Sequence, residues 1–99
     1  MPYATVTYPN QSGRKFDFDY YMKKHIPMVA DLLHTTIEVS KGVATPTGAP
    51  APVVCTARIH INSLEEFSAA MAKHGPQIMG DIPNYTSIQP VLQIDEVLN

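Results

Sequence analysis

Residues 16–28 read FDFDYYMKKHIPM, and this stretch predicts the first helix of the fold. Asp17 is a good N-cap residue, and from residue 18 to about residue 34 the apolar side chains follow helical spacing. Two residues do not fit an ordinary buried stripe. His25 places an imidazole on it, and Pro27 removes a backbone donor from the helix interior. This stretch therefore predicts a helix and also contains a candidate functional residue, His25.

Segments with the two-residue period of β-strands surround this helix. They span residues 3–8, 35–43, 53–61 and 88–97. A second helix begins after Ser63, which forms a capping box with Glu66, and the pair Gly75-Pro76 is expected to kink this helix or restart it. Residues 42–52, GVATPTGAPAP, are expected to form an extended hairpin loop. Pro90 within the last strand favours an edge position or a bulge.

The order β-α-β-β-α-β predicts an α+β fold, a ferredoxin-like sandwich with residues 1–99 in a single domain. Its two helices are expected to cover one face of the sheet only. The other face mixes polar groups such as Arg58 and His60 with apolar ones such as Tyr3 and Val91. Such a mixed face suits a second sheet better than water, so we expect a homodimer.

Composition excludes several classes of partner. The net charge is only −2 and the sequence has no run of Lys and Arg, which argues against nucleic acids and anionic membranes. No stretch approaches the roughly 18 apolar residues of a membrane span, and MPYATVTY does not have the pattern of a secretory signal. The single Cys55 excludes an internal disulfide and a cysteine-based zinc site. We therefore expect a cytoplasmic protein.

His25 is the main catalytic candidate. It follows Tyr21 by four positions and precedes Val29 by four, so the three side chains share the helix face turned to the sheet. An imidazole there can act as general acid or base, since its ordinary pKa of about 6.5 lies near working pH, and Tyr21 can orient a ligand or hydrogen-bond the ring. A kink at Pro27 would open a concavity beside the imidazole. The alternative is a structural role, with both residues satisfied within the core.

Four stretches carry a resemblance to a known family. They are YP at 8–9, FDFDYYMKKHIPM at 16–28, GPQIMGDIPNYT at 75–86 and PVLQIDEV at 90–97. In this order they resemble the EthD family (from ethyl tert-butyl ether degradation), which belongs to the dimeric α+β barrel superfamily. The resemblance implies two ferredoxin-like protomers packed sheet to sheet. Kinship of fold does not fix a reaction, because the superfamily includes isomerases, cyclases, monooxygenases and haem-degrading enzymes.

Further side chains are candidates for a substrate pocket. His74 lies on an apolar stripe directly before a helix break, and the resemblance favours the turn IPNYT at residues 82–86 as a pocket rim. Tyr20 is expected to lean outward or towards a partner protomer, and Asp81 to be structural. The pocket candidates are Tyr20, Met28, His74, Asn84 and Tyr85.

No cofactor or metal is predicted. The four histidines lack close ligand spacing, and the sequence has no nicotinamide fingerprint, Gly-rich phosphate loop or serine nucleophile elbow. Members of the EthD family are often labelled as reductases, so an oxidoreductase is implied by resemblance alone. The sequence contains no motif that would bind the nicotinamide or flavin of such an enzyme.

Three hypotheses for the function follow. The first is a cofactor-independent enzyme, an isomerase, cyclase, decarboxylase or oxidoreductase that binds a small apolar or aromatic metabolite and uses His25 as a proton shuttle. The second is a non-catalytic ligand-binding or accessory module of a catabolic pathway. The third is a dimeric domain whose histidines are core groups. Residue types and spacing leave all three open.

Overall fold

A computed structural model describes residues 2–99 and confirms the ferredoxin-like α+β fold. Four strands form one antiparallel sheet in the order β2-β3-β1-β4. Their bounds are β1 Pro2–Pro9, β2 Ile37–Lys41, β3 Val53–His60 and β4 Val91–Glu96. The last strand is an edge strand, as predicted, but it begins only after Pro90, whose missing N–H cannot join the ladder.

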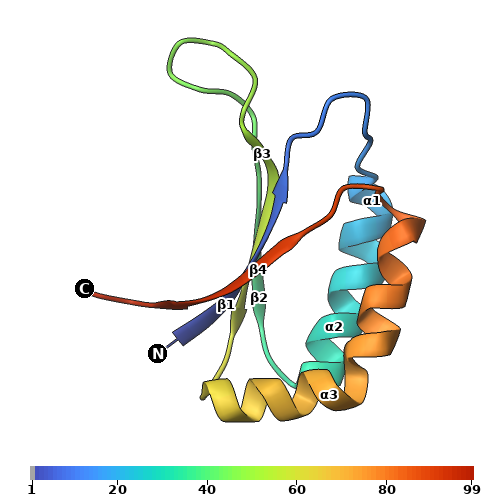
Figure 1. The fold of residues 1–99 in the computed structure, drawn as a ribbon, viewed down its shortest axis with the longest axis vertical. Coiled ribbons are helices and arrows are strands. Elements are labelled where there is room, and N and C mark those ends of the chain that lie inside the picture. The colour runs from blue at the N-terminus through green and yellow to red at the C-terminus, as the bar shows by residue number, and fades with distance from the viewer. Residues whose placement is uncertain (1) are drawn as a thin grey trace.

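The helices lie on one face of this sheet, and the other face is left without a helical layer (Figure 1). The first helical segment comprises α1 Phe18–Tyr20, the π-helix η1 Tyr21–His25 and α2 Ile26–Leu33. The second comprises α3 Leu64–Asp81 and the 3₁₀ turn η2 Ile82–Asn84. Among residues 2–99 no helix is long and apolar enough to cross a membrane.

The first helix is capped as predicted but contains one wide turn. The Asp17 side chain accepts from the backbone N–H of Tyr20 at 3.1 Å, and a π turn follows in which the N–H of Ile26 donates to Tyr21 O. Pro27 lies in the first turn of α2, directly after this segment. The expected opening beside His25 is therefore a widened turn, of the kind that often marks functional sites.

The second helix is continuous through Pro76, and Figure 1 shows that it bends. Its first turns cross one end of the molecule, and its later turns run beside α2. Ser63 caps its start by accepting from the N–H of Glu66 at 3.1 Å. Pro76 removes the donor that Ala72 C=O would use, which explains the change of direction. The bend brings the end of α3 alongside the start of the first helix.

Two backbone contacts fix that juxtaposition. Phe16 forms an isolated antiparallel bridge with Thr86, and the N–H of Asp17 donates to Tyr85 O at 2.8 Å. The turn that follows α3 is thereby held against the N-terminus of the first helix. Residues more than sixty positions apart in the sequence therefore share one end of the molecule.

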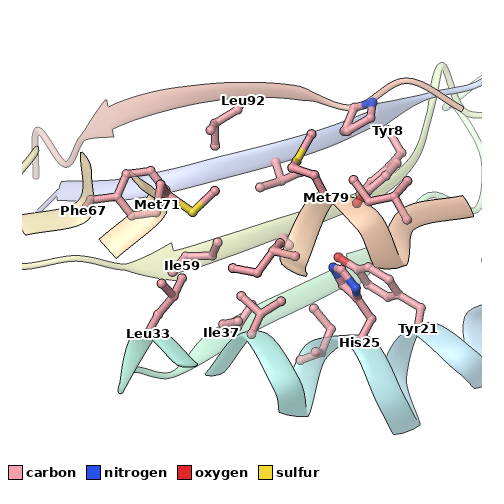
Figure 2. Close-up of a pocket in the computed structure, with 17 residues that line it drawn as sticks. Tyr8, Tyr21, His25, Leu33, Ile37, Ile59, Phe67, Met71, Met79 and Leu92 are labelled. Carbon is pink, nitrogen blue, oxygen red and sulfur yellow. The ribbon is translucent and has the colours of Figure 1, made fainter. Parts of the chain in front are cut away.

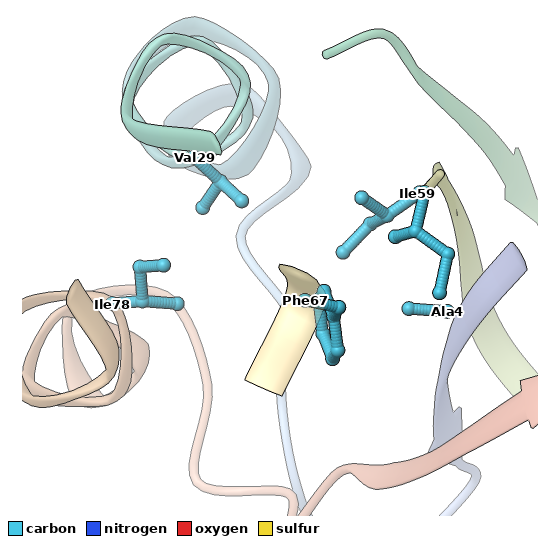
Figure 3. Packing of buried hydrophobic residues seen from close by; sticks show 6 residues of the cluster. Ala4, Val29, Ile59, Phe67 and Ile78 are labelled. Atoms are coloured by element: carbon cyan, nitrogen blue, oxygen red, sulfur yellow. The ribbon is translucent and has the colours of Figure 1, made fainter. Parts of the chain in front are cut away.

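The buried core between sheet and helices divides into two clusters. The apolar cluster is shown in Figure 3. It consists of Ala4, Val29, Ile59, Ile61, Phe67 and Ile78. The tyrosine cluster consists of Tyr8, Tyr21, Cys55, Tyr85 and Ile88. Alternation along the strands supplies both clusters, because Ala4 and Tyr8 of β1 share the face that lies opposite Ile59 and Cys55 of β3.

Candidate functional site

A cavity of about 120 Å³ lies between the helices and the sheet and spans both core clusters. Figure 2 shows Tyr8, Tyr21 and His25 at one end and Phe67, Met71 and Leu33 towards the other. The remaining wall is apolar. It is formed by Val6, Ile26, Val29, Ile37, Ala57, Ile59, Ile78, Met79, Ile82, Pro90 and Leu92. Polar groups therefore reach the cavity at one end only.

His25 is held at that end by contacts on both ring nitrogens. Its Nδ1 lies 2.9 Å from Oδ2 of Asp81, and its Nε2 lies 3.2 Å from the hydroxyl of Tyr85. The Tyr85 hydroxyl in turn lies 2.6 Å from that of Tyr8. A continuous chain of hydrogen bonds thus runs from Asp81 through His25 and Tyr85 to Tyr8, which lines the cavity.

Asp81 is the anchor of this chain, because three side chains converge on its carboxylate. Tyr20 donates its hydroxyl to Oδ1 at 2.6 Å, and Asn84 donates its amide to the same oxygen at 2.9 Å. His25 occupies the other oxygen. Asp81 at the end of α3 and Tyr85 directly after η2 therefore supply both hydrogen bonds to the imidazole.

The protonation states follow from these surroundings. Burial lowers the pKa of His25 below 6.5, although the hydrogen bond and charge of Asp81 act in the opposite direction. Burial would raise the pKa of Asp81, but hydrogen bonds from Tyr20, Asn84 and His25 together outweigh it and hold that pKa below 3.8. Burial raises the pKa of Tyr8 to about 12. At neutral pH Asp81 is therefore a carboxylate, His25 is neutral and Tyr8 keeps its proton.

Tyr21 borders the cavity without joining the chain. Its ring stacks on that of His25, with centroids 5.5 Å apart and planes 17° from parallel, and its hydroxyl lies near the buried thiol of Cys55. Burial raises the pKa of both Tyr21 and Cys55. Tyr21 therefore fixes the orientation of the imidazole by packing, while its own hydroxyl points to a different partner.

The predicted site residues divide into three groups. His25 and Tyr21 line the cavity, whereas Tyr20, Asn84 and Tyr85 stand behind it and support the imidazole or its carboxylate. Tyr20 does not lean outward, because its hydroxyl reaches Asp81 across the contact between the two helical segments. The third group consists of Met28 and His74, which belong neither to the hydrogen-bonded chain nor to the cavity wall.

Sequence reasoning missed two members of the chain, Tyr8 and Asp81, although each leaves a signal. Asp81 ends a helix, where the macrodipole disfavours a carboxylate unless other groups compensate for it. Tyr8 shares the helix-facing side of its strand with Ala4 and Val6, and a buried phenol there requires a partner for its hydroxyl. Neither signal identifies which distant residue supplies that partner.

Across residues 2–99 no group of three or more His, Cys, Asp or Glu side chains is placed to hold a metal ion. Throughout the same residues every buried side-chain nitrogen and oxygen has a hydrogen-bond partner. The polar end of the cavity is thus a completed network. Any ligand must use the lone pairs or protons that this network turns towards the cavity.

Comparison with known proteins finds two solved structures with this architecture. The chain resembles the crystal structure of an EthD-like protein from Ralstonia eutropha JMP134, with 43% sequence identity and a TM-score of 0.92 over 99% of this chain and 92% of that one. It also resembles an ethyl tert-butyl ether d (EthD) family protein from Bacillus halodurans C-125, with 18% identity and a TM-score of 0.70 over 99% of both chains. The second likeness concerns the fold alone. No protein-family model and no curated protein matches the sequence.

Proposed function

The chain belongs to the family of EthD-like proteins, and from this premise we propose that it is a cofactor-independent, cytoplasmic enzyme that moves a proton on a small, mainly apolar metabolite. The observation that carries the proposal is the hydrogen-bonded chain from Asp81 through His25 and Tyr85 to Tyr8, which ends at an apolar cavity. A histidine whose orientation is fixed by a carboxylate is a common general base.

In the proposed reaction His25 accepts a proton from the bound molecule through the hydroxyls of Tyr8 and Tyr85 and returns it at the same or another atom. Asp81 holds the ring in place and stabilises the imidazolium that forms, since the carboxylate lies 2.9 Å from Nδ1. The apolar wall limits the water that reaches the reacting group. Isomerisation and cyclisation both require proton transfers of this kind. The chemistry needs neither an electron carrier nor a metal.

Proton exchange gives a direct test that does not require the natural substrate. Single-ring ketones, enols and lactones would be incubated with the protein in D₂O, and loss of their acidic C–H signals followed by NMR. We expect the protein to accelerate exchange in at least one compound. His25→Asn should lower that rate by about 10²–10⁴-fold. His74→Asn is the matched control, because His74 lies off the cavity and should leave the rate unchanged.

The outcomes separate the remaining hypotheses. Binding without exchange would reject the enzyme and favour a ligand-binding or accessory module, in which His25 and its partners only anchor the ligand. A panel without any binding, together with a His25 variant that changes stability alone, would reject both and leave a structural domain. A rate that survives His25→Asn would reject His25 as the shuttle.

We also propose that the protein acts as a homodimer. The face of the sheet opposite the helices has no helical layer, and it carries the half-exposed Val91 and the ring of Tyr3 packed on His60. Such a face suits a second copy of the sheet. Analytical ultracentrifugation should give twice the mass of the chain, and Val91→Asp should shift the equilibrium towards the monomer. A monomeric wild-type protein would reject the proposal.

A further inference from the structure

The dimensions and charge of the cavity limit its ligand. A dry apolar cavity of about 150 Å³ holds one benzene, so about 120 Å³ leaves room for no more than one small ring. Among the described residues that line the cavity none is Lys, Arg, Asp or Glu. A free carboxylate or phosphate would lose its hydration there without gaining an opposite charge. The ligand is therefore uncharged when it binds.

The sense of the hydrogen-bond chain limits the ligand further. A carboxylate accepts only, so Nδ1–H of His25 must donate to Asp81. The neutral imidazole then presents a lone pair at Nε2, and Tyr85 must donate to it. Because the proton of Tyr85 is used in this way, Tyr8 must donate its own proton to the oxygen of Tyr85. Every donor points towards Asp81.

A bound molecule therefore finds a hydrogen-bond acceptor at the polar end of the cavity. With its proton committed to Tyr85, the hydroxyl oxygen of Tyr8 offers only lone pairs to a bound molecule. We infer that this pocket selects an uncharged, single-ring compound that donates a hydrogen bond to Tyr8, a phenol or an enol rather than a ketone, ether or carboxylate. The inference rests on the proposed function for its site and adds the chemical class of the ligand.

The same chain explains how a proton would leave such a ligand. The O–H proton passes to Tyr8, the proton of Tyr8 passes to Tyr85, and that of Tyr85 passes to Nε2 of His25. The ligand is then an anion and the imidazole a cation paired with Asp81, so charge is balanced. After the transfer every hydrogen bond from His25 to the cavity is reversed, and Tyr8 donates to the anion. The two protonation states of His25 thus present opposite polarities to the cavity.

Four compounds of similar size test the inference, namely phenol, anisole, toluene and benzoate. Affinities would be measured by ligand-observed NMR at about pH 7.5, where phenol keeps its proton as tyrosine does. We expect phenol to bind about tenfold more tightly than toluene, anisole to bind no better than toluene, and benzoate not to bind. In the Tyr8→Phe variant the affinity for phenol should fall to the affinity for toluene. Unchanged toluene binding shows that this variant is folded.

A second variant probes the sense of the chain. Tyr85→Phe removes the acceptor of the Tyr8 proton, so Tyr8 becomes free to donate into the cavity. Anisole should then gain severalfold in affinity relative to toluene. Because binding is read without turnover, this order of affinities can hold even where the proton-exchange assay finds no catalysis.

Several results would overturn the inference. The first is that benzoate binds the wild-type protein most tightly, and the second is that anisole binds it as tightly as phenol does. The third is that Tyr8→Phe still prefers phenol to toluene, and the fourth is that none of the four compounds binds. Catalysed exchange restricted to compounds without a hydrogen-bond donor would also overturn it, and would leave the proposed function intact.

Discussion

The two clusters of the core fill the same space between sheet and helices with different chemistry. The apolar cluster, which contains Ile61 and Phe67, has no polar side-chain atom. The tyrosine cluster buries three phenols and a thiol beside an imidazole that is only 4% exposed. Burying such polar groups costs free energy unless each one is hydrogen-bonded, and among residues 2–99 no buried side-chain nitrogen or oxygen lacks a partner.

The difference separates what stabilises the protein from what a ligand would use. Packing apolar side chains is favourable wherever they fit, so the apolar cluster needs no particular partner for each residue. The tyrosine cluster depends on a fixed set of donors and acceptors that reach across β1, the first helix and the turn after α3. Loss of one partner leaves another unsatisfied. We therefore expect substitutions in the two clusters to act on different properties.

The largest change in stability should come from the apolar cluster. Ile61→Ala should lower the free energy of unfolding by about 2–5 kcal/mol, because it removes buried methyl groups and leaves a cavity. Ile61 does not line the central cavity, so ligand affinity of the folded protein should not change. Urea denaturation and ligand titration of one preparation check both expectations. Ile61→Val is the control and should cost only about 0.5–1.5 kcal/mol.

An intermediate change should come from the anchor of the tyrosine cluster. Asp81→Asn keeps the size of the side chain but removes the carboxylate that accepts from His25, Tyr20 and Asn84. The free energy of unfolding should fall by about 1–3 kcal/mol. The pKa of His25 should fall further, since Asp81 is the group that raises it against burial. NMR titration of the ring measures this shift, and an unchanged pKa would contradict the assigned contact.

A smaller change in stability should come from the middle of the chain. Tyr85→Phe removes one hydroxyl and should cost about 0.5–1.5 kcal/mol, yet it cuts the path between His25 and Tyr8. Proton exchange should therefore slow in this variant far more than its stability suggests. Tyr21→Phe is the matched control, because the Tyr21 hydroxyl is not a member of the hydrogen-bonded chain. Equal exchange rates in the two variants would contradict a route through Tyr85.

The smallest effect concerns pH. Folding lowers the pKa of His25 below 6.5, so the unfolded chain binds this proton more readily. The contribution of neutral His25 to stability is full above pH 6.5 and is lost as the pH falls through the lowered folded-state value. Denaturation curves at several pH values should show this loss in the wild type and a weaker one in His25→Asn. A wild-type stability that rises on acidification through this window would reverse the assignment.

The sequence predicted the architecture because its signals are local. The caps at Asp17 and Ser63, the alternation of the strands and the kink of the helix that contains Pro76 each depend on neighbouring residues, and all appear in the structure. The EthD resemblance is confirmed by the 43% identical structure, which matches over 99% of this chain.

The site was predicted less completely because its contacts are distant. Residues 25 and 81 meet only because α3 bends and the turn at 82–86 is held against the first helix. No periodicity encodes that meeting, so the sequence predicts only a structural role for Asp81 and a strand position for Tyr8. The sequence predicts that Tyr20 leans outward or towards a partner protomer, because adjacent residues diverge on a regular helix, whereas its phenol is long enough to reach the carboxylate.

The π turn at Tyr21–His25 makes the number of residues between these two side chains important for the site. A π turn holds about one residue more than an α turn, so deleting either Lys23 or Lys24 would close it to an α turn and place the imidazole three positions after Tyr21 instead of four. Every side chain of the hydrogen-bonded chain would still be present, but the geometry that lets one ring reach both Asp81 and Tyr85 would change. The same loss of one residue within the loop at 42–52 would only shorten a hairpin. Tolerance to insertion and deletion is thus a property that distinguishes these two segments, independently of which amino acids they contain.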